Sequence, residues 1–291
     1  MLTARFRSCK KIVGGSDMAS VMRRFVSEYA ALGRVLEPSD MFALGIATVA
    51  NAPTILRTKK LTDLDAAMRR NMTVKFDGSC IALPIKDIDK LLEGRGDNPT
   101  FGNVREIYAR NCYLDRLKIE RPVRAVLDGG ANRGMFSILA LTHLGAEIAV
   151  GVEPIPNYLP VFNLLLNANG VAQERAPRYQ RFLVNPSTER TDPEKNISIQ
   201  TILREQKVDR FQLVKIDIEG FEKALFSEPD WLARVDTICM ELHPHFVGDL
   251  SVVPETLKQY GFEYRLMNQE GEPTDIRDAM FLQASCTGAL A

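Results

Sequence analysis

The sequence predicts an α/β fold in which helices cover both faces of a mostly parallel β-sheet. From Val123 onward, short runs rich in β-forming residues alternate with helical patterns, as they do in chains of βαβ units. A glycine-rich turn joins the first run to a helix, which is where such sheets bind nucleotide-like ligands. The 291 residues are 45% hydrophobic and 25% charged, so the chain is long enough for one large domain or for one domain with an appendage.

Charge and hydropathy exclude several classes of partner. Lys and Arg total 37, as do Asp and Glu, so no net charge attracts the chain to nucleic acid or to acidic lipid. The apolar stretch 41–50 is interrupted by Gly45 and is far shorter than the about 20 residues that span a bilayer. The basic segment 1–11 is followed by Gly-Gly-Ser-Asp, and not by the apolar core of a secretory signal. We therefore expect a cytoplasmic protein with a small-molecule partner.

The first seventy or so residues predict a helical accessory region, 1–72, ahead of the main domain, 73–291. Three helices are expected there: an amphipathic helix from Met18 to a stop at Gly33, a second over 41–50 capped by Ser39 or Asp40, and a third from Thr62 to Arg70. Packing against the flank of the sheet is the favoured role of this region. A lid, a surface between copies in a homo-oligomer and an acceptor-docking element are the alternatives.

The remaining elements follow in order along the main domain. A hairpin is predicted where the β-rich runs 74–76 and 80–83 flank Asp77-Gly78, and a helix is centred on 104–114. The polar, proline-containing segment 185–196 is expected to be a surface loop. The candidate strands are 125–127, 148–152, 179–184, 211–218, 237–242, 262–266 and 279–283, with helices over 134–144 and 157–169 and an antiparallel hairpin formed by the last two strands.

The glycine-rich turn is the most informative motif. The first strand leads into the run LDGGANRGMF at 127–136, whose glycines allow the backbone to approach a ligand at a helix N-terminus. A nicotinamide fingerprint would read G-x-G-x-x-G, but Ala131 stands at the second glycine position. The spacing D-x-G-x-x-x-G, from Asp128 through Gly130 to Gly134, resembles motif I of class I S-adenosylmethionine-dependent methyltransferases.

A second acid supports a cofactor site. Glu153 follows the strand 148–152 and precedes Pro154, where a carboxylate can accept hydrogen bonds from ribose hydroxyls. NAD enzymes share this feature, so Glu153 does not by itself distinguish the two cofactors. The structural alternative makes Asp128 a turn cap and Glu153 an exposed acid. Spacing, strand ends and glycines agree, which favours ligand binding.

Four blocks of sequence together resemble the FkbM family of methyltransferases. They are LDGGANRGMFS at 127–137, VEP at 152–154 with NLLLN at 163–167, LVKIDIEGFE at 213–222, and ELH at 241–243. The resemblance implies a class I, Rossmann-like methyltransferase fold with a seven-stranded sheet, and S-adenosylmethionine as cofactor. Gly129 and Phe221 depart from the family, which commonly has an aliphatic and a small residue there. The residues expected to bind the cofactor are Asp128, Gly130, Ala131, Asn132, Gly134, Glu153, Pro154 and Asn167.

The strand 211–218 carries the candidate catalytic acid. Asp217 lies near its carboxyl end, which in this fold adjoins the strand before the glycine-rich turn. Charges on a central strand are costly unless they are paired or functional, so Lys215 and Asp217 require an explanation. Our hypothesis is that Asp217 positions a substrate hydroxyl or accepts its proton, while Lys215 balances the charge. Glu219 is expected to face the substrate, and Glu222 to favour a helix N-terminus.

Two histidines follow the strand 237–242. His243 is a candidate general base, because an ordinary histidine titrates near neutrality. Glu241 and His245 are candidate substrate contacts. With Asp217 these side chains could surround a divalent cation, but no dedicated ligand spacing is present, so a metal is not favoured.

The function expected from these features is S-adenosylmethionine-dependent O-methylation. The resemblance implies as acceptor a sugar, a polyketide or a similar hydroxylated small molecule. One alternative is a non-catalytic S-adenosylmethionine-binding or scaffold protein, which would have no need for Asp217, Glu241 and His243. Another is an NAD-dependent oxidoreductase, which the glycine spacing disfavours.

Overall fold

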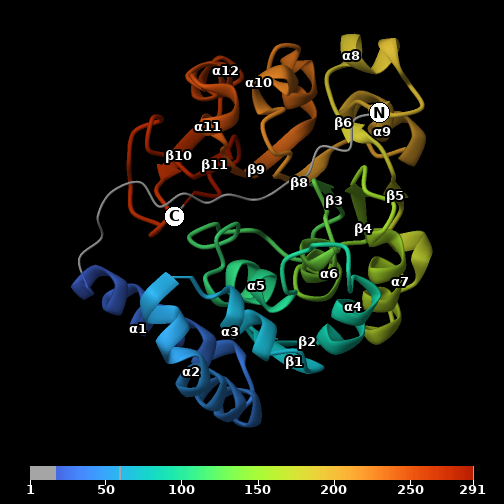
Figure 1. Ribbon diagram of the computed structural model, residues 1–291. Coiled ribbons are helices and arrows are strands. Elements are labelled where there is room, and N and C mark those ends of the chain that lie inside the picture. The colour runs from blue at the N-terminus through green and yellow to red at the C-terminus, as the bar shows by residue number, and fades with distance from the viewer. Residues whose placement is uncertain (1–17, 59, 291) are drawn as a thin grey trace.

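A seven-stranded β-sheet forms the centre of the computed structural model, which describes residues 18–58 and 60–290 (Figure 1). Its strands are β3 (Ala125–Gly129), β4 (Ile148–Val152), β5 (Arg178–Tyr179), β8 (Phe211–Ile216), β9 (Val235–Glu241), β10 (Glu263–Met267) and β11 (Phe281–Ser285). They lie in the order β10-β11-β9-β8-β3-β4-β5, and those from β9 to β5 are parallel. β11 is antiparallel to both β9 and β10. The Rossmann-like class I methyltransferase fold with its C-terminal antiparallel hairpin is confirmed.

Helices cover both faces of this sheet, as expected (Figure 1). One face carries α6 (Met135–Thr142) and α7 (Tyr158–Ala168), and the other carries α9 (Ile199–Gln206), α10 (Glu222–Leu225) and α12 (Val252–Gln259). Alternate residues of a strand point to opposite faces. Val126 therefore packs in the core beneath α6, while Leu127 packs in the core on the other side. A central strand with two buried faces can carry few polar groups, which concentrates the polar side chains at its ends.

The N-terminal helices pack on the face that carries α6. The elements before the sheet are α1 (Met18–Val35), α2 (Pro38–Thr58), α3 (Thr62–Ala67), the hairpin of β1 (Met72–Phe76) and β2 (Ser79–Leu83), and α4 (Ile85–Leu91). The predicted hairpin is confirmed. α1 continues past Gly33, where a stop was expected, because Val35 and Leu36 are buried in the shared core. α2 is longer than expected, and α3 ends before Arg69.

A buried ion cluster ties α1 and α3 to the next segment. The expected helix over 104–114 consists of α5 (Phe101–Asn103) and a π-helix, η1 (Val104–Ala109), and ends five residues early. From η1, Arg105 donates hydrogen bonds of 2.6 Å to Glu28 and 2.7 Å to Asp65. Both acids are almost fully buried. Burial alone would lower the pKa of Arg105, but the two carboxylates outweigh it and raise that pKa.

Two expectations for the second half of the domain are wrong in detail. The expected strand 179–184 is divided between β5 and β6 (Phe182–Leu183), which pairs in a separate sheet with β7 (Asn196–Ile197). The expected loop 185–196 contains α8 (Pro186–Thr191), because Asn185 caps it by accepting a 2.7 Å hydrogen bond from Thr188 N. The remaining short elements are η2 (Gln173–Arg175), η3 (Pro229–Arg234) and α11 (Pro244–Val247).

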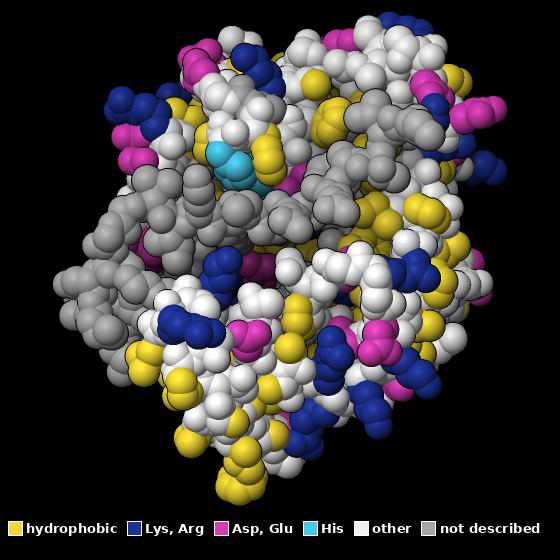
Figure 2. Space-filling model, viewed as in Figure 1, with side chains coloured by type: hydrophobic (Ala, Val, Ile, Leu, Met, Phe, Trp, Pro, Cys, Tyr) yellow, Lys and Arg dark blue, Asp and Glu magenta, His cyan; other side chains and the backbone are white. Residues whose placement is uncertain are grey.

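Hydrophobic side chains also remain on the outer face of the N-terminal helices (Figure 2). The exposed large residues of α2 are Phe42, Ile46, Val49 and Leu56. Within the described part of the chain, no helix combines the length and the apolar character needed to cross a membrane.

Candidate functional site

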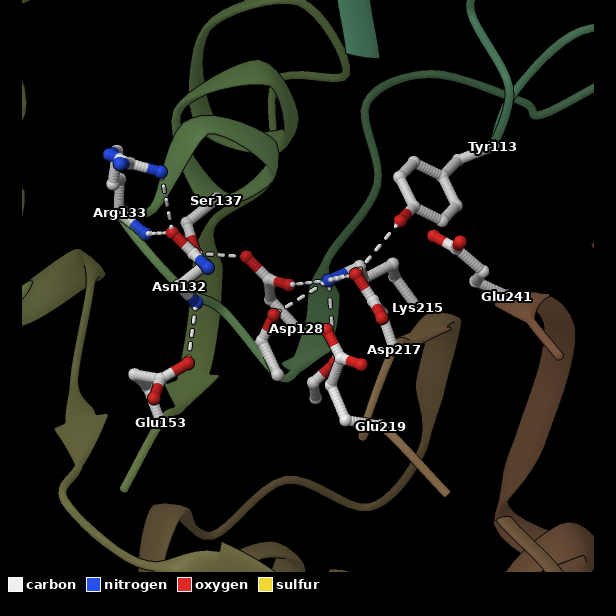
Figure 3. Close-up of polar contacts among 12 residues, drawn as sticks. Tyr113, Asp128, Asn132, Arg133, Ser137, Glu153, Lys215, Asp217, Glu219 and Glu241 are labelled. Atoms are coloured by element: carbon white, nitrogen blue, oxygen red, sulfur yellow. Dashed lines mark hydrogen bonds and ion pairs between the residues drawn. The ribbon is translucent and has the colours of Figure 1, made fainter. Parts of the chain in front are cut away.

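The carboxyl ends of β3 and β8 lie side by side at the centre of the sheet (Figure 3). In the register of the two strands Asp128 is opposite Lys215, and Gly129 is opposite Ile216. The chain passes from β3 to β4 on one side, whereas β8 is followed by β9 on the other, so the order of the strands reverses here. Ligands of open α/β sheets bind at such a switch point, which is where the site was expected.

The glycine-rich loop after β3 requires its glycines. Gly130 and Gly134 have φ angles of 71° and 89°, in the left-handed region that favours glycine. A Cβ atom on Gly130 would lie 1.7 Å from the carbonyl oxygen of Asp217, and one on Gly134 would lie 2.1 Å from the Phe162 ring. At these two glycines the loop backbone therefore packs directly against the residue that follows β8 and against α7, with no side chain between them. A Cβ on Gly129 would lie 2.7 Å from the end of the Leu183 side chain and 3.2 Å from the Lys215 carbonyl oxygen, so space is also limited there.

Asp128 is sealed beneath the loop. Its carboxylate is fully buried, accepts a 2.7 Å hydrogen bond from the Ser137 hydroxyl and lies 3.3 Å from Lys215 Nζ. These contacts tie β3 to α6 and β8 directly beneath the loop.

Lys215 is the buried cation that complements this loop. Its ammonium group donates a 2.7 Å hydrogen bond to Gly130 O and lies 3.7 Å from Asp217 Oδ2. It also lies 5.3 Å from the centre of the Tyr113 ring. Burial alone would lower the pKa of Lys215, but Asp128 and Asp217 outweigh it and raise that pKa. Lys215 therefore stays charged and joins the two carboxylates.

Glu153 reaches back to the glycine-rich loop. Its carboxylate accepts hydrogen bonds of 2.8 Å from Asn132 N and 3.0 Å from Ile155 N, and the residue is buried. Burial raises the pKa of Glu153, although these two N–H groups and Arg178 oppose the shift. The alternative that made Glu153 an exposed acid is wrong. Pro154 follows it, half-buried at the same edge of the sheet.

Asn167 does not join the cluster. It lies exposed in the last turn of α7, at the opposite end of that helix from Glu153. Two residues later, the Asn169 side chain bonds to Ala82 of β2, on the N-terminal side of the domain. The sequence block that contains Asn167 is a helix end packed beside the β1–β2 hairpin, and its predicted contact with the cofactor is not supported.

Asp217 is the acid that remains accessible. Its side chain is 25% exposed and accepts a 3.2 Å hydrogen bond from the hydroxyl of Tyr113. Burial, together with Asp217 and Glu241, raises the pKa of Tyr113 well above its ordinary value, so the phenol keeps its proton and donates it to this bond. Sequence reasoning missed Tyr113, because no motif surrounds it and only the fold brings it to the site.

His243 is held by a carboxylate on α10. Its Nδ1 lies 2.6 Å from Oε1 of Glu222, and both side chains are buried. Burial alone would lower the pKa of His243, but Glu222, Asp217 and Glu241 outweigh it and raise that pKa to about 9. Such an imidazole carries its proton at neutral pH and cannot accept another. The prediction of His243 as a general base is therefore not supported in this state.

Of the other predicted substrate residues, two face His243 and one does not. Its Nε2 faces Glu219 Oε2 at 3.7 Å and Glu241 Oε1 at 3.9 Å. His245 is exposed, and its ring contacts Phe246 with a centroid distance of 4.3 Å. Glu219 and Glu241 thus belong to the cluster around His243, whereas His245 lies on its outer side.

A pocket adjoins Asp217 and the glycine-rich loop. Its cavity volume is about 50 Å³. Arg133, which helps to line it, is held by hydrogen bonds of 2.9 Å to Asn103 and 2.6 Å to Asn98 O. The lining residues are Asn103, Glu106, Ile107, Cys112, Tyr113, Ala131, Asn132, Arg133, Met135, Phe136, Lys215, Asp217 and Glu241. Those from 103–113 come from a segment in which the sequence offered no chemical signal.

Comparison with known proteins gives a family match. Residues 173–264 match the family model of the methyltransferase FkbM domain. Over this segment the chain is therefore similar to FkbM methyltransferase domains. Among curated proteins, no sequence matches the chain significantly.

The chain is also similar to solved methyltransferase structures. One is a putative SAM-dependent methyltransferase from Streptococcus mutans, with 11% identity, a TM-score of 0.43, and coverage of 74% of this chain and 55% of that one. Another is ribosomal protein L11 methylase from Lactobacillus delbrueckii subsp. bulgaricus, with 15% identity, a TM-score of 0.37, and coverage of 57% and 71%. A third is the METTL16 MTase domain, with 12% identity, a TM-score of 0.41, and coverage of 93% and 92%.

FkbM methyltransferase domains imply S-adenosylmethionine as cofactor, and the residues at the switch point fit it. Each oxygen of Glu153 accepts one N–H and keeps a second lone pair for a ribose hydroxyl. Asp217 and Glu241, which line the pocket, suit a positively charged sulfonium.

Proposed function

We propose that this methyltransferase transfers the methyl group of S-adenosylmethionine to a hydroxyl of a sugar, a polyketide or a similar small molecule. The observation that carries the proposal is the position of Asp217, a partly exposed carboxylate at the switch point, beside the pocket and anchored by Tyr113 and Lys215. When bound, S-adenosylmethionine supplies a methyl group on a positively charged sulfur, which an oxygen nucleophile can displace.

The residues of the chain then have separate tasks. Asp217 accepts the hydroxyl proton of the acceptor as the new carbon–oxygen bond forms and the carbon–sulfur bond breaks. Tyr113 holds one carboxylate oxygen by its 3.2 Å hydrogen bond and so orients Asp217. Lys215, a buried cation 3.7 Å away, forms an ion pair with the same carboxylate and helps to hold its position. Glu153 and the glycine-rich loop hold the cofactor.

An assay with methyl-labelled S-adenosylmethionine tests this proposal. The purified full chain is incubated with extracts of hydroxylated metabolites, and mass spectrometry identifies the product that gains one labelled methyl group. Asp217→Asn should reduce the transfer rate about a hundredfold or more, because the proton acceptor is lost. Asp209→Asn, a fully exposed acid before β8, is the matched control.

Cofactor binding is measured separately by calorimetric titration with S-adenosylhomocysteine and with NAD. We expect S-adenosylhomocysteine to bind with equal affinity to the wild type and to Asp217→Asn. Transfer by Asp217→Asn at the wild-type rate overturns the role of Asp217. Tight binding of NAD alone overturns the proposed function as a whole.

A further inference from the structure

We propose that Asp217, Glu219 and His243 form a binding site for a divalent metal cation of the Mn²⁺ class. One ligand atom from each of the three residues can be chosen so that all lie within 4.8 Å of one another. Nε2 of His243 lies 3.7 Å from Asp217 Oδ1 and 3.7 Å from Glu219 Oε2. Two carboxylate oxygens and an imidazole nitrogen around one point are a donor set that divalent transition metals favour.

The orientation of His243 is the observation that points to a ligand. Its side chain is only 6% exposed, yet Nε2 is directed toward three carboxylate oxygens at 3.7, 3.7 and 3.9 Å. These distances are too long for hydrogen bonds and leave space between the nitrogen and the oxygens. A cation placed among them would be about 2.0–2.2 Å from each ligand, after small rotations of the carboxylates.

Glu222 supplies the second feature of a metal-binding histidine. Its Oε1 lies 2.6 Å from Nδ1 of His243, and the acid is fully buried. Histidines that ligate metals almost always donate their other ring N–H to a carboxylate or a carbonyl, which fixes the tautomer and the ring orientation. Glu222 is a positioning residue in this site. A cation would take the place of the proton on Nε2, the ring nitrogen that Glu222 leaves facing Asp217 and Glu219.

The backbone brings the two carboxylate ligands to the same side. Glu219 has a φ angle of 51°, in the left-handed region, and Gly220 follows it with φ 102°. This turn returns the chain toward Asp217 before α10 begins with Glu222. The Glu219 side chain is 58% exposed and that of Asp217 is 25% exposed, so the outer side of the site is open to a further ligand.

The role of the cation rests on the proposed function. A cation held by three protein ligands keeps open coordination positions, and oxygen atoms bind there readily. Because Asp217 also borders the pocket, those positions would face the acceptor. The acceptor class is then narrowed to molecules with two neighbouring oxygens, such as a vicinal diol or a hydroxyl beside a carbonyl, which can bind one cation together.

Manganese binding to the full chain tests the site without cofactor or acceptor. The protein is treated with a chelator and dialysed, and the electron paramagnetic resonance of free Mn²⁺ is recorded during a titration. We expect one Mn²⁺ per chain. Glu219→Gln is a largely exposed substitution that should fold normally and should weaken binding at least tenfold. Glu147→Gln, an exposed acid before β4, is the matched control and should bind as the wild type does.

Two further variants make the assignment specific. Glu222→Gln should weaken Mn²⁺ binding about tenfold to a hundredfold, because loss of an outer carboxylate partner has effects of that size. Asp217→Asn should weaken it as Glu219→Gln does. The proposal is overturned if the wild type binds no Mn²⁺, or if both Glu219→Gln and Asp217→Asn bind it unchanged. Calorimetry with S-adenosylhomocysteine on the same samples reports the cofactor site independently, so failure of the metal site and failure of the proposed function are distinguishable.

Discussion

The ammonium group of Lys215 donates a 2.7 Å hydrogen bond to the carbonyl oxygen of Gly130. A side chain of β8 thereby holds the loop that follows β3. The same ammonium group lies 3.3 Å from the buried carboxylate of Asp128. Loop geometry and charge balance at the switch point thus depend on one lysine.

Replacing Lys215 by Met should destabilise the fold and the loop together. The change leaves Asp128 buried without its cation, and breaking a buried ion pair costs about 3–5 kcal/mol. Urea denaturation measures the free energy of unfolding, and calorimetry should record weaker binding of S-adenosylhomocysteine. Lys223→Met, on the exposed side of α10, serves as control. If Lys215→Met lost no more unfolding free energy and no more affinity for S-adenosylhomocysteine than Lys223→Met does, the central role of Lys215 would be contradicted.

Replacing Gly130 by Ala should be far more damaging than the same change at Gly94. The two glycines have similar φ angles, 71° and 76°. A Cβ on Gly130 meets the Asp217 carbonyl at 1.7 Å, whereas nothing lies within 4 Å of one on Gly94. Gly94→Ala therefore reports backbone strain alone, about 1–2 kcal/mol. Gly130→Ala should lose more stability than this and should not bind S-adenosylhomocysteine. Equal unfolding free energies for the two variants would show that the close approach of Gly130 to Asp217 does not affect stability.

We propose that the N-terminal helices α1 and α3 are fastened to the main domain through Arg105. Arg105→Met would leave Glu28 and Asp65 buried without a cation and should cost about 3–5 kcal/mol. Hydrogen exchange should accelerate in α1 and α3 before it does so in β3 or β8. Arg57→Met, which changes an exposed residue of α2, should leave the exchange pattern as it is. Uniform acceleration throughout the chain would argue against a separate attachment of these helices.

His143 should contribute stability that is lost on mild acidification. Burial and the neighbouring Arg121 lower the pKa of His143, while Asp77 opposes them, and its Nδ1 lies 3.1 Å from the Ser79 hydroxyl. The folded state favours the neutral ring. The stabilisation is therefore present above the ordinary pKa of 6.5 and is lost as the pH falls through the lower pKa of the folded state.

Urea denaturation at about pH 7.5 and about pH 5.5, on either side of the ordinary histidine pKa, measures this effect. His143 makes the free energy of unfolding larger at the higher pH, whereas His243, whose pKa is raised to about 9, acts in the opposite sense. His143→Gln cannot take up the proton, so the free energy of unfolding at about pH 7.5 minus that at about pH 5.5 should be smaller in this variant than in the wild type. An unchanged difference in the variant would assign the acid sensitivity to other groups.

Local pattern determined most of the architecture of this protein. The alternation of strands and helices after Val123, the turn at 77–78 and the spacing of Asp128, Gly130 and Gly134 all reflect backbone preferences over a few residues. Such preferences fail where packing competes with them. α1 passes through Gly33 because the next turn is buried, and Asn185 caps a helix in a segment whose composition is typical of a loop.

Which charged groups are buried and which are accessible to solvent depends on the tertiary packing. The sequence placed Asp128, Asp217 and Glu219 at one edge of a sheet, but packing buried Asp128 under the loop, left Asp217 partly open and exposed Glu219. It also brought Tyr113 to Asp217 and Glu222 to His243, and it kept Asn167 at the far end of α7. Burial and pairing depend on contacts between residues far apart in the chain, which no local pattern encodes.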